Sequence, residues 1–260
     1  MRWQTKLFAA LLCLNGLALS ASAQTLSPFQ PANRPLGLPL VGPTYLDGSD
    51  AASQSFDNYK QSFLDTITAN LPEAVAFSGE SLNQLDPTRL YFMFDYAPRV
   101  YYIYEGACYD NALGVTIATV SAPTNKPTTG TSYTVFPFGH SSISPACASG
   151  SGKRSKSEPL LPGDFVQLPL VTAGQQLAFF LMANMDSHSN PADVYYNGNS
   201  NNPDNFQHLV CFFPSESQYL IIGFEDMLNG GDRDCNDLMF VVDIGPNNAA
   251  LLRSPILLPQ

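Results

Sequence analysis

The hydrophobic pattern of the chain has one helical part and a longer part with strand character. Within residues 55–69, apolar side chains recur at intervals of three and four, and charged residues fall on the other faces. This spacing predicts one amphipathic helix, which ends at Leu71-Pro72 because proline cannot continue a helix. After Pro87, short apolar and aromatic runs alternate with turn residues, as is typical of strands.

Short strand candidates fill the rest of the chain. They lie in RLYFMFDYAPRVYYIYEG (two strands around a proline turn), VTIATVS, SYTVFPF, DFVQLPLVTAGQQLAFFLMAN (two strands joined at Ala173-Gly174), FQHLVCFF, QYLIIGFED and DLMFVVDIG. The unbroken apolar runs 220–222 and 238–242 indicate strands at the centre of a core. The pattern predicts a mainly β fold, a β-sandwich or jelly-roll-like fold with one N-terminal amphipathic helix.

The first residues have the features of a secretory signal. A basic head (1–6) precedes an apolar run (7–19), and small residues at 21–23 offer a cleavage point before Gln24. A membrane anchor is the alternative, but the apolar run is shorter than the roughly 20 residues that span a bilayer. We therefore expect export to the periplasm or the extracellular space, without membrane insertion after cleavage.

The same features divide the chain into parts. We predict a signal peptide (1–23), an extended lead segment (24–52), a helical segment (53–86), a β-sandwich domain (87–245) and a C-terminal tail (246–260). Within the domain, the polar stretch DSHSNPADVYYNGNSNNPDN is expected to be a long loop because it is rich in turn residues.

The net charge argues against nucleic-acid partners. It is −10 for the whole chain and becomes −12 once the two bases of the signal, Arg2 and Lys6, are removed. An acidic protein does not bind nucleic acid or anionic membranes through bulk charge.

Four cysteines remain after cleavage, namely Cys108, Cys147, Cys211 and Cys235. An even count in an exported protein suggests disulfides. Three pairings are possible; Cys108–Cys147 with Cys211–Cys235 is favoured because each bond closes the shorter loop. Zinc is disfavoured because the chain has no CxxC and no nearby histidine pair. The histidines His140, His188 and His208 are interpreted as packed or surface residues.

Acidic residues concentrate in one loop between the last two predicted strands. Gly230 and Gly231 allow a tight turn or positive φ there. The side chains of this loop that we propose as metal ligands are Glu225, Asp226, Asp232, Asp234, Asn236 and Asp237. Their carboxylates repel one another unless a cation lies among them, and oxygen-only ligands favour calcium. The alternative is a solvated acidic turn.

The spacing of this loop is similar to that of the helix-loop-helix calcium site but does not match it. Oxygen-bearing residues stand at Asp232, Asp234 and Asn236, as in the first, third and fifth positions of that motif. Asp237 stands where the motif needs glycine, and a strand follows in place of a helix. We therefore expect a β-hairpin loop with similar coordination chemistry.

At this point the sequence resembles a known family. YLIIGFEDMLNGGDRDCNDLMFVVD is similar to the signature of the secreted bacterial family of domain of unknown function 4114 (DUF4114), and YEGACYDNALGV and LPGDFVQL…AGQQLAFFLMAN are similar to its upstream segments. The resemblance covers about 87–243. It implies an extracytoplasmic β-rich module, calcium dependence and glycan recognition. Cys235 replaces the usual aromatic residue, which implies a disulfide at this loop.

Three functions are weighed from these features. The first is a calcium-binding adhesion or glycan-recognition module, with candidate ligand-binding residues Glu105, Asp110, Asn111, Tyr195 and Tyr196. The second is a structural piece of the cell envelope or matrix that calcium stiffens. The third is a glycoside hydrolase using paired carboxylates such as Glu225 and Glu105. No catalytic residue is assigned, because nothing completes a catalytic constellation. The two tyrosines could equally belong to a strand face.

Overall fold

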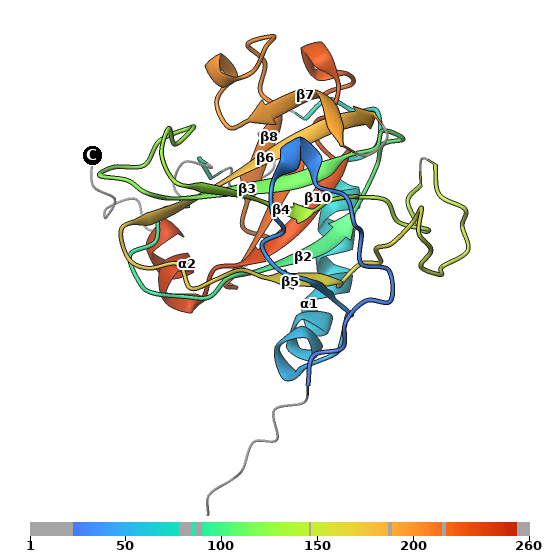
Figure 1. Ribbon diagram of the computed structural model, residues 1–260, viewed down its shortest axis with the longest axis horizontal. Coiled ribbons are helices and arrows are strands. Elements are labelled where there is room, and N and C mark those ends of the chain that lie inside the picture. The colour runs from blue at the N-terminus through green and yellow to red at the C-terminus, as the bar shows by residue number, and fades with distance from the viewer. Residues whose placement is uncertain are drawn as a thin grey trace, which may run out of the picture.

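Two antiparallel sheets packed face to face form the body of the protein (Figure 1). The computed structural model describes residues 23–77, 85–86, 90–145, 147–186, 189–214 and 217–253. The predicted signal peptide, apart from Ala23, and the end of the predicted tail lie outside these residues. Among the described residues, no helix is both long enough and apolar enough to cross a membrane.

The mainly β sandwich expected from the sequence is confirmed. The larger sheet contains, in spatial order, β1 (Thr44–Tyr45), β5 (Phe165–Gln167), β2 (Arg99–Tyr104), β10 (Leu238–Asp243), β9 (Tyr219–Phe224) and β8 (Leu209–Phe212). The smaller sheet contains β4 (Thr131–Phe136), β3 (Ala112–Thr119), β6 (Gln175–Asp186) and β7 (Asn190–Tyr196).

The larger sheet is buried on both faces. In β2, Val100 and Tyr102 belong to the core between the sheets, whereas Tyr101 and Ile103 belong to a second core on the outer face. Successive strand residues point to opposite faces, so a strand covered on both sides is apolar throughout. This explains the unbroken apolar runs of β9 and β10, which lie inside the sheet as predicted.

Helix α1 (Ala51–Asn70) covers the outer face of the larger sheet (Figure 1). Its buried residues include Phe56, Phe63 and Ile67, and the Phe56 ring stacks on Tyr101 with centroids 3.9 Å apart. The helix begins earlier than the predicted residue 55 because Asp50 caps it. The Asp50 carboxylate accepts the Ser53 N–H (2.8 Å), and the Ser53 hydroxyl faces the Asp50 N–H (3.0 Å), which completes a capping box.

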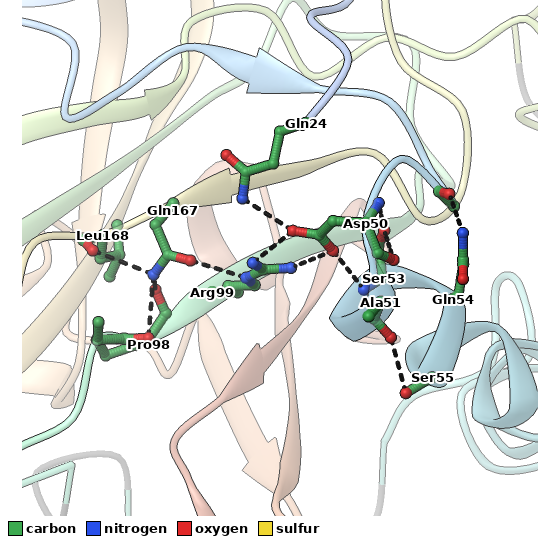
Figure 2. A network of polar contacts seen from close by, with 12 residues as sticks. Gln24, Asp50, Ala51, Ser53, Gln54, Ser55, Pro98, Arg99, Gln167 and Leu168 are labelled. Atoms are coloured by element: carbon green, nitrogen blue, oxygen red, sulfur yellow. Dashed lines mark hydrogen bonds and ion pairs between the residues drawn. The ribbon is translucent and has the colours of Figure 1, made fainter. Parts of the chain in front are cut away.

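An ion pair joins this helix start to the sheet. Figure 2 shows the Arg99 guanidinium facing the Asp50 carboxylate, with N–O distances of 2.8 and 2.7 Å, while its Nε donates to Gln167 at 2.7 Å. Burial opposes ionisation of Asp50, but Arg99, the Ser53 N–H and Gln24 outweigh it and hold the Asp50 pKa well below its ordinary value. The lead segment, the start of the helix and β2 therefore meet at the Asp50 carboxylate, and Arg99 links them to β5 through Gln167.

Three predicted elements differ in the structure. β7 lies inside the predicted polar loop, because β6 is twelve residues long and offers it a partner. A second helix, α2 (Pro246–Arg253), forms in the predicted tail and buries Ala249 and Leu252 against the core between the sheets. The described residues before Pro98, 90–97, do not form a strand and make isolated bridges at Tyr91 and Tyr96.

One of the two expected disulfides is present. Cys108 and Cys147 are bonded, whereas Cys211 and Cys235 are free and buried. The predicted Cys211–Cys235 bond is wrong because the two thiols lie on opposite faces of the larger sheet. Cys211 belongs to the core between the sheets, and Cys235 to the outer core beside α1.

Replacing Asp50 tests this junction. Asp50→Ala removes the helix cap and leaves the half-buried Arg99 guanidinium without its carboxylate. We expect the free energy of unfolding to fall by about 2–4 kcal/mol, measured by urea denaturation at neutral pH. Asp65→Ala, at an exposed position of the same helix, should change it by less than about 0.5 kcal/mol. Equal effects of the two substitutions would contradict the junction.

Candidate functional site

The acidic loop, residues 225–237, is the hairpin connection between β9 and β10, as the sequence predicts. It contains a short 3-10 turn, Leu228–Gly230. Gly230 and Gly231 adopt positive φ, as expected, and so do Asn229, Arg233 and Cys235. Repeated left-handed residues wind the loop tightly, so that several of its carboxylates turn inward at the end of the sheet.

Three of these carboxylates form a buried group. Glu225, Asp226 and Asp237 each offer an oxygen within 4.8 Å of the others, and all three residues are buried. Arg233, the one basic residue of the loop, does not lie among them, because its guanidinium rests 4.9 Å from the centre of the Phe206 ring. Among the described residues, no ion pair joins a base to these three carboxylates.

Neutral donors fix the three carboxylates in place. Asp237 Oδ2 accepts the Asp226 N–H at 2.7 Å, and Asp226 Oδ2 accepts the side-chain amide of Asn111 at 2.7 Å. Glu225 accepts the backbone N–H groups of Met227 (3.3 Å) and Arg233 (3.1 Å). These bonds orient the oxygens but bring no positive side chain to the group.

The charge state of the group follows from burial. Loss of water raises the pKa of Glu225 to about 7 and that of Asp226 to about 6, and nearby carboxylates add to both increases. For Asp237, burial and then the charges of Asp226 and Glu225 raise the pKa to about 10. Without a cation, the folded protein therefore favours protons on these oxygens.

A pocket of about 510 Å³ opens on this group. The Cys108–Cys147 bond holds one wall, the segment 106–109, to the segment that follows β4. The described residues that line the pocket are Glu73, Gly106, Ala107, Cys108, Tyr109, Glu225, Asp226, Met227, Gly231, Asp232 and Asp237. Its size and its carboxylates suit a hydrated cation.

The other predicted ligands of the loop lie in a second group. Asp232 and Asp234 gather with Glu73, which follows α1, and their carboxylate oxygens lie within 4.8 Å of one another. Asn236 is fully buried, and its Nδ2 donates to the Leu71 carbonyl at 3.1 Å. The expected acidic ligands thus fall into two groups of mutually close oxygens, and Glu73 and Asp232 line the same pocket as the first group.

The upstream cluster Glu105, Asp110 and Asn111 joins the loop only in part. Asn111 reaches Asp226 directly, as described above. Glu105 and Asp110 instead bracket His140, with N–O distances of 2.9 Å to each carboxylate. Burial lowers the His140 pKa, but the two carboxylates outweigh it and raise that pKa above its ordinary value. Glu105 is not among the described residues that line the pocket.

The two tyrosines face different surroundings. Tyr195 is fully buried and stacks on His208 with ring centroids 3.6 Å apart, so it cannot meet a ligand from solvent. That candidate is corrected, because β7 turns this side chain into the core. Tyr196 is partly exposed, and Lys126 Nζ lies 3.6 Å from its ring centre. The strand-face interpretation of this pair is confirmed.

Two further contributions are not visible in the sequence pattern. Glu73 stands far from the other acids of the group in the sequence. The hydrogen bond that attaches its segment to the loop, from the Ala74 N–H to Asp234 (2.9 Å), joins residues 160 positions apart. Gly106 lies so close to the loop that an added side-chain carbon would fall 1.9 Å from Asn236 Oδ1. The similarity of the Glu-Gly-Ala segment to DUF4114 proteins is the one signal that pointed to Gly106.

Comparison with known proteins gives one match. Residues 171–245 match the family described as Domain of unknown function (DUF4114). This range holds β6 to β10 with the acidic loop, so the resemblance is confirmed there, while residues 87–170 lie outside the match. No curated protein and no solved structure matches the chain.

The raised pKa values predict a pH dependence of the metal-free protein. Below about pH 4, both folded and unfolded forms carry protons on these carboxyls. As pH rises through 6 and 7, the unfolded chain has already released protons that the folded protein retains, so higher pH favours unfolding. We expect the free energy of unfolding in chelator to fall between about pH 5 and pH 8.

Asp237→Asn isolates one group in this test. The amide stays neutral and its oxygen can still accept the Asp226 N–H. The stability of this variant relative to wild type should grow with pH, by at most about 1.4 kcal/mol per pH unit. Urea denaturation across this pH range measures the difference. A difference that stays constant from pH 5 to pH 8 would show that Asp237 does not carry the effect.

Proposed function

We propose that the protein is an exported β-sandwich module that binds calcium through the acidic loop matched to the DUF4114 family. The observation that carries the proposal is the buried group of Glu225, Asp226 and Asp237, whose carboxylates pair with no basic side chain in the part of the chain that the structure describes. Burying like charges costs free energy unless a counter-charge accompanies them. A divalent cation supplies that charge at this position.

The donor set favours calcium over softer metals. Every side chain in the group offers oxygen, and the described residues lining the pocket add no histidine and no free thiol. Calcium takes six to eight oxygens, with water filling positions that the protein leaves open. The pocket opens beside the three carboxylates and leaves room for such water.

Export is supported by two features of the chain. The N-terminal residues have the order of a secretory signal, and the Cys108–Cys147 disulfide is of the kind that persists in oxidising compartments. Calcium bound by the acidic loop would order that loop, which contacts the segment after α1 and the segment after β2. The proposed place of action is the cell surface or matrix, where the module serves adhesion.

A second pocket favours glycan recognition as the form of that adhesion. It measures about 390 Å³, and its described lining residues are Leu85, Asp86, Asn125, Asn197, Gly198, Asn199 and Gln207. Side-chain amides both donate and accept hydrogen bonds, which suits the hydroxyl groups of a sugar. Tyr196 precedes Asn197 at the end of β7, but its ring packs against Phe180 and Lys126 and is not among the described residues that line the pocket.

Calcium should stabilise the fold by mass action. We expect added calcium to raise the melting temperature above its value in chelator, because the ion binds the folded form only. Asp237→Asn should lose a large part of this shift, and the matched change Asp65→Asn on α1 should keep it. Differential scanning fluorimetry at pH 8 measures both. A shift that Asp237→Asn retains in full would place calcium elsewhere.

Glycan recognition should show as retention on polysaccharide. We expect the protein to be retarded on one or more of agarose, cellulose and chitin resins, and Asn197→Ala to elute early because one side of the pocket is lost. Asn58→Ala, on the exposed face of α1, is the control. Retention by none of the resins, together with a calcium shift, would favour the structural role in which calcium only stiffens the fold.

A further inference from the structure

The second acidic group lies where the segment after α1 crosses the acidic loop. Glu73, Asp232 and Asp234 bring carboxylate oxygens within 4.8 Å of one another; Asp234 is buried and the other two are exposed. Burial and the charges of Asp234 and Asp232 raise the Glu73 pKa. Exposed acids gather without a metal in many proteins, so the group alone indicates no ligand.

A buried amide oxygen beside this group does indicate one. Asn236 is fully buried, and its Oδ1 has no hydrogen-bond donor among the described residues. A buried acceptor without a partner costs about 1–3 kcal/mol. Such an atom is rare in folded proteins unless water or an ion satisfies it.

Asn236 Oδ1 borders the same space as the Glu73 carboxylate. A side-chain carbon placed on Gly106 would lie 1.9 Å from Asn236 Oδ1 and 2.9 Å from Glu73 Oε2. Both oxygens therefore border one small space that exists because residue 106 is glycine. The Asn236 amide cannot turn freely, since its Nδ2 donates to the Leu71 carbonyl at 3.1 Å.

Backbone contacts fix the remaining partners. Asp234 accepts the Ala74 N–H at 2.9 Å and the Asn236 N–H at 3.1 Å. The Phe77 N–H donates to the Arg233 carbonyl at 2.7 Å. The segment that carries Glu73 is thus attached to the acidic loop before any ion binds.

We propose that the protein has a second divalent-cation site, formed by the carboxylates of Glu73, Asp232 and Asp234 and by Asn236 Oδ1. All four side chains offer oxygen, so the ion is of the calcium class. It satisfies the buried amide oxygen and separates the three like charges. It also ties the end of α1 to the β9–β10 loop, which extends the calcium binding proposed above to a second ion.

The number of bound calcium ions tests the proposal. Isothermal titration calorimetry of the purified protein with calcium chloride alone, checked by native mass spectrometry, should give two ions for wild type. Glu73→Gln should bind one, because it removes a ligand of the second site only. Asp237→Asn should also bind one, the combination should bind none, and Glu158→Gln, the matched surface control, should bind two.

Gly106→Ala provides an independent variant, because its methyl group fills the space between Asn236 and Glu73; it should lose the same ion as Glu73→Gln. A wild type that binds one ion, lost in Asp237→Asn and kept in Glu73→Gln, would overturn the second site and leave the proposed function standing. One ion lost in Glu73→Gln and kept in Asp237→Asn would support the second site and overturn the first. No bound ion would overturn both.

Discussion

A buried group of carboxylates that pairs with no basic side chain of the described residues is the constraint on which this structure depends. The carboxylates of Glu225, Asp226 and Asp237 accept hydrogen bonds from backbone N–H groups and one side-chain amide. The basic residue of their loop, Arg233, packs on Phe206 instead. Hydrogen bonds orient carboxylates and lower the cost of burial, but they do not cancel a cluster of charges. The folded loop is therefore stabilised by protons on these oxygens or by a cation, and the proposed function assigns that place to calcium.

The sandwich holds both ends of that loop in fixed positions. β9 and β10 lie inside a sheet with an apolar core on each face, so both ends of the loop begin from rigid positions. Two segments distant in sequence then close over it. The turn after α1 donates to Asp234, and the disulfide-held segment after β2 approaches until Gly106 touches Asn236. A cation bound at this junction would stabilise the packing of helix, sheet and loop together.

The features predicted correctly from the sequence are those that depend on short-range patterns of residues. Apolar periodicity gave α1 and most of the strands, and the acids between two apolar runs gave the hairpin loop. The division of the acids into two groups could not be predicted, because it depends on Glu73, which tertiary packing brings to the loop. The Cys211–Cys235 prediction failed for a similar reason: loop length says nothing about which face of a sheet a thiol occupies. Strand β7 was missed, and Tyr195 was therefore also considered as a ligand-binding residue, because a polar stretch became a strand only when β6 offered it an edge.

The most direct test of calcium binding at the acidic loop is a crystal structure of the protein grown with calcium chloride, with anomalous diffraction used to locate the ion. We predict an anomalous peak among the carboxylates of Glu225, Asp226 and Asp237, with oxygens at about 2.3–2.6 Å. Clear density for these three side chains at neutral pH, with no peak among them at saturating calcium, would contradict the account.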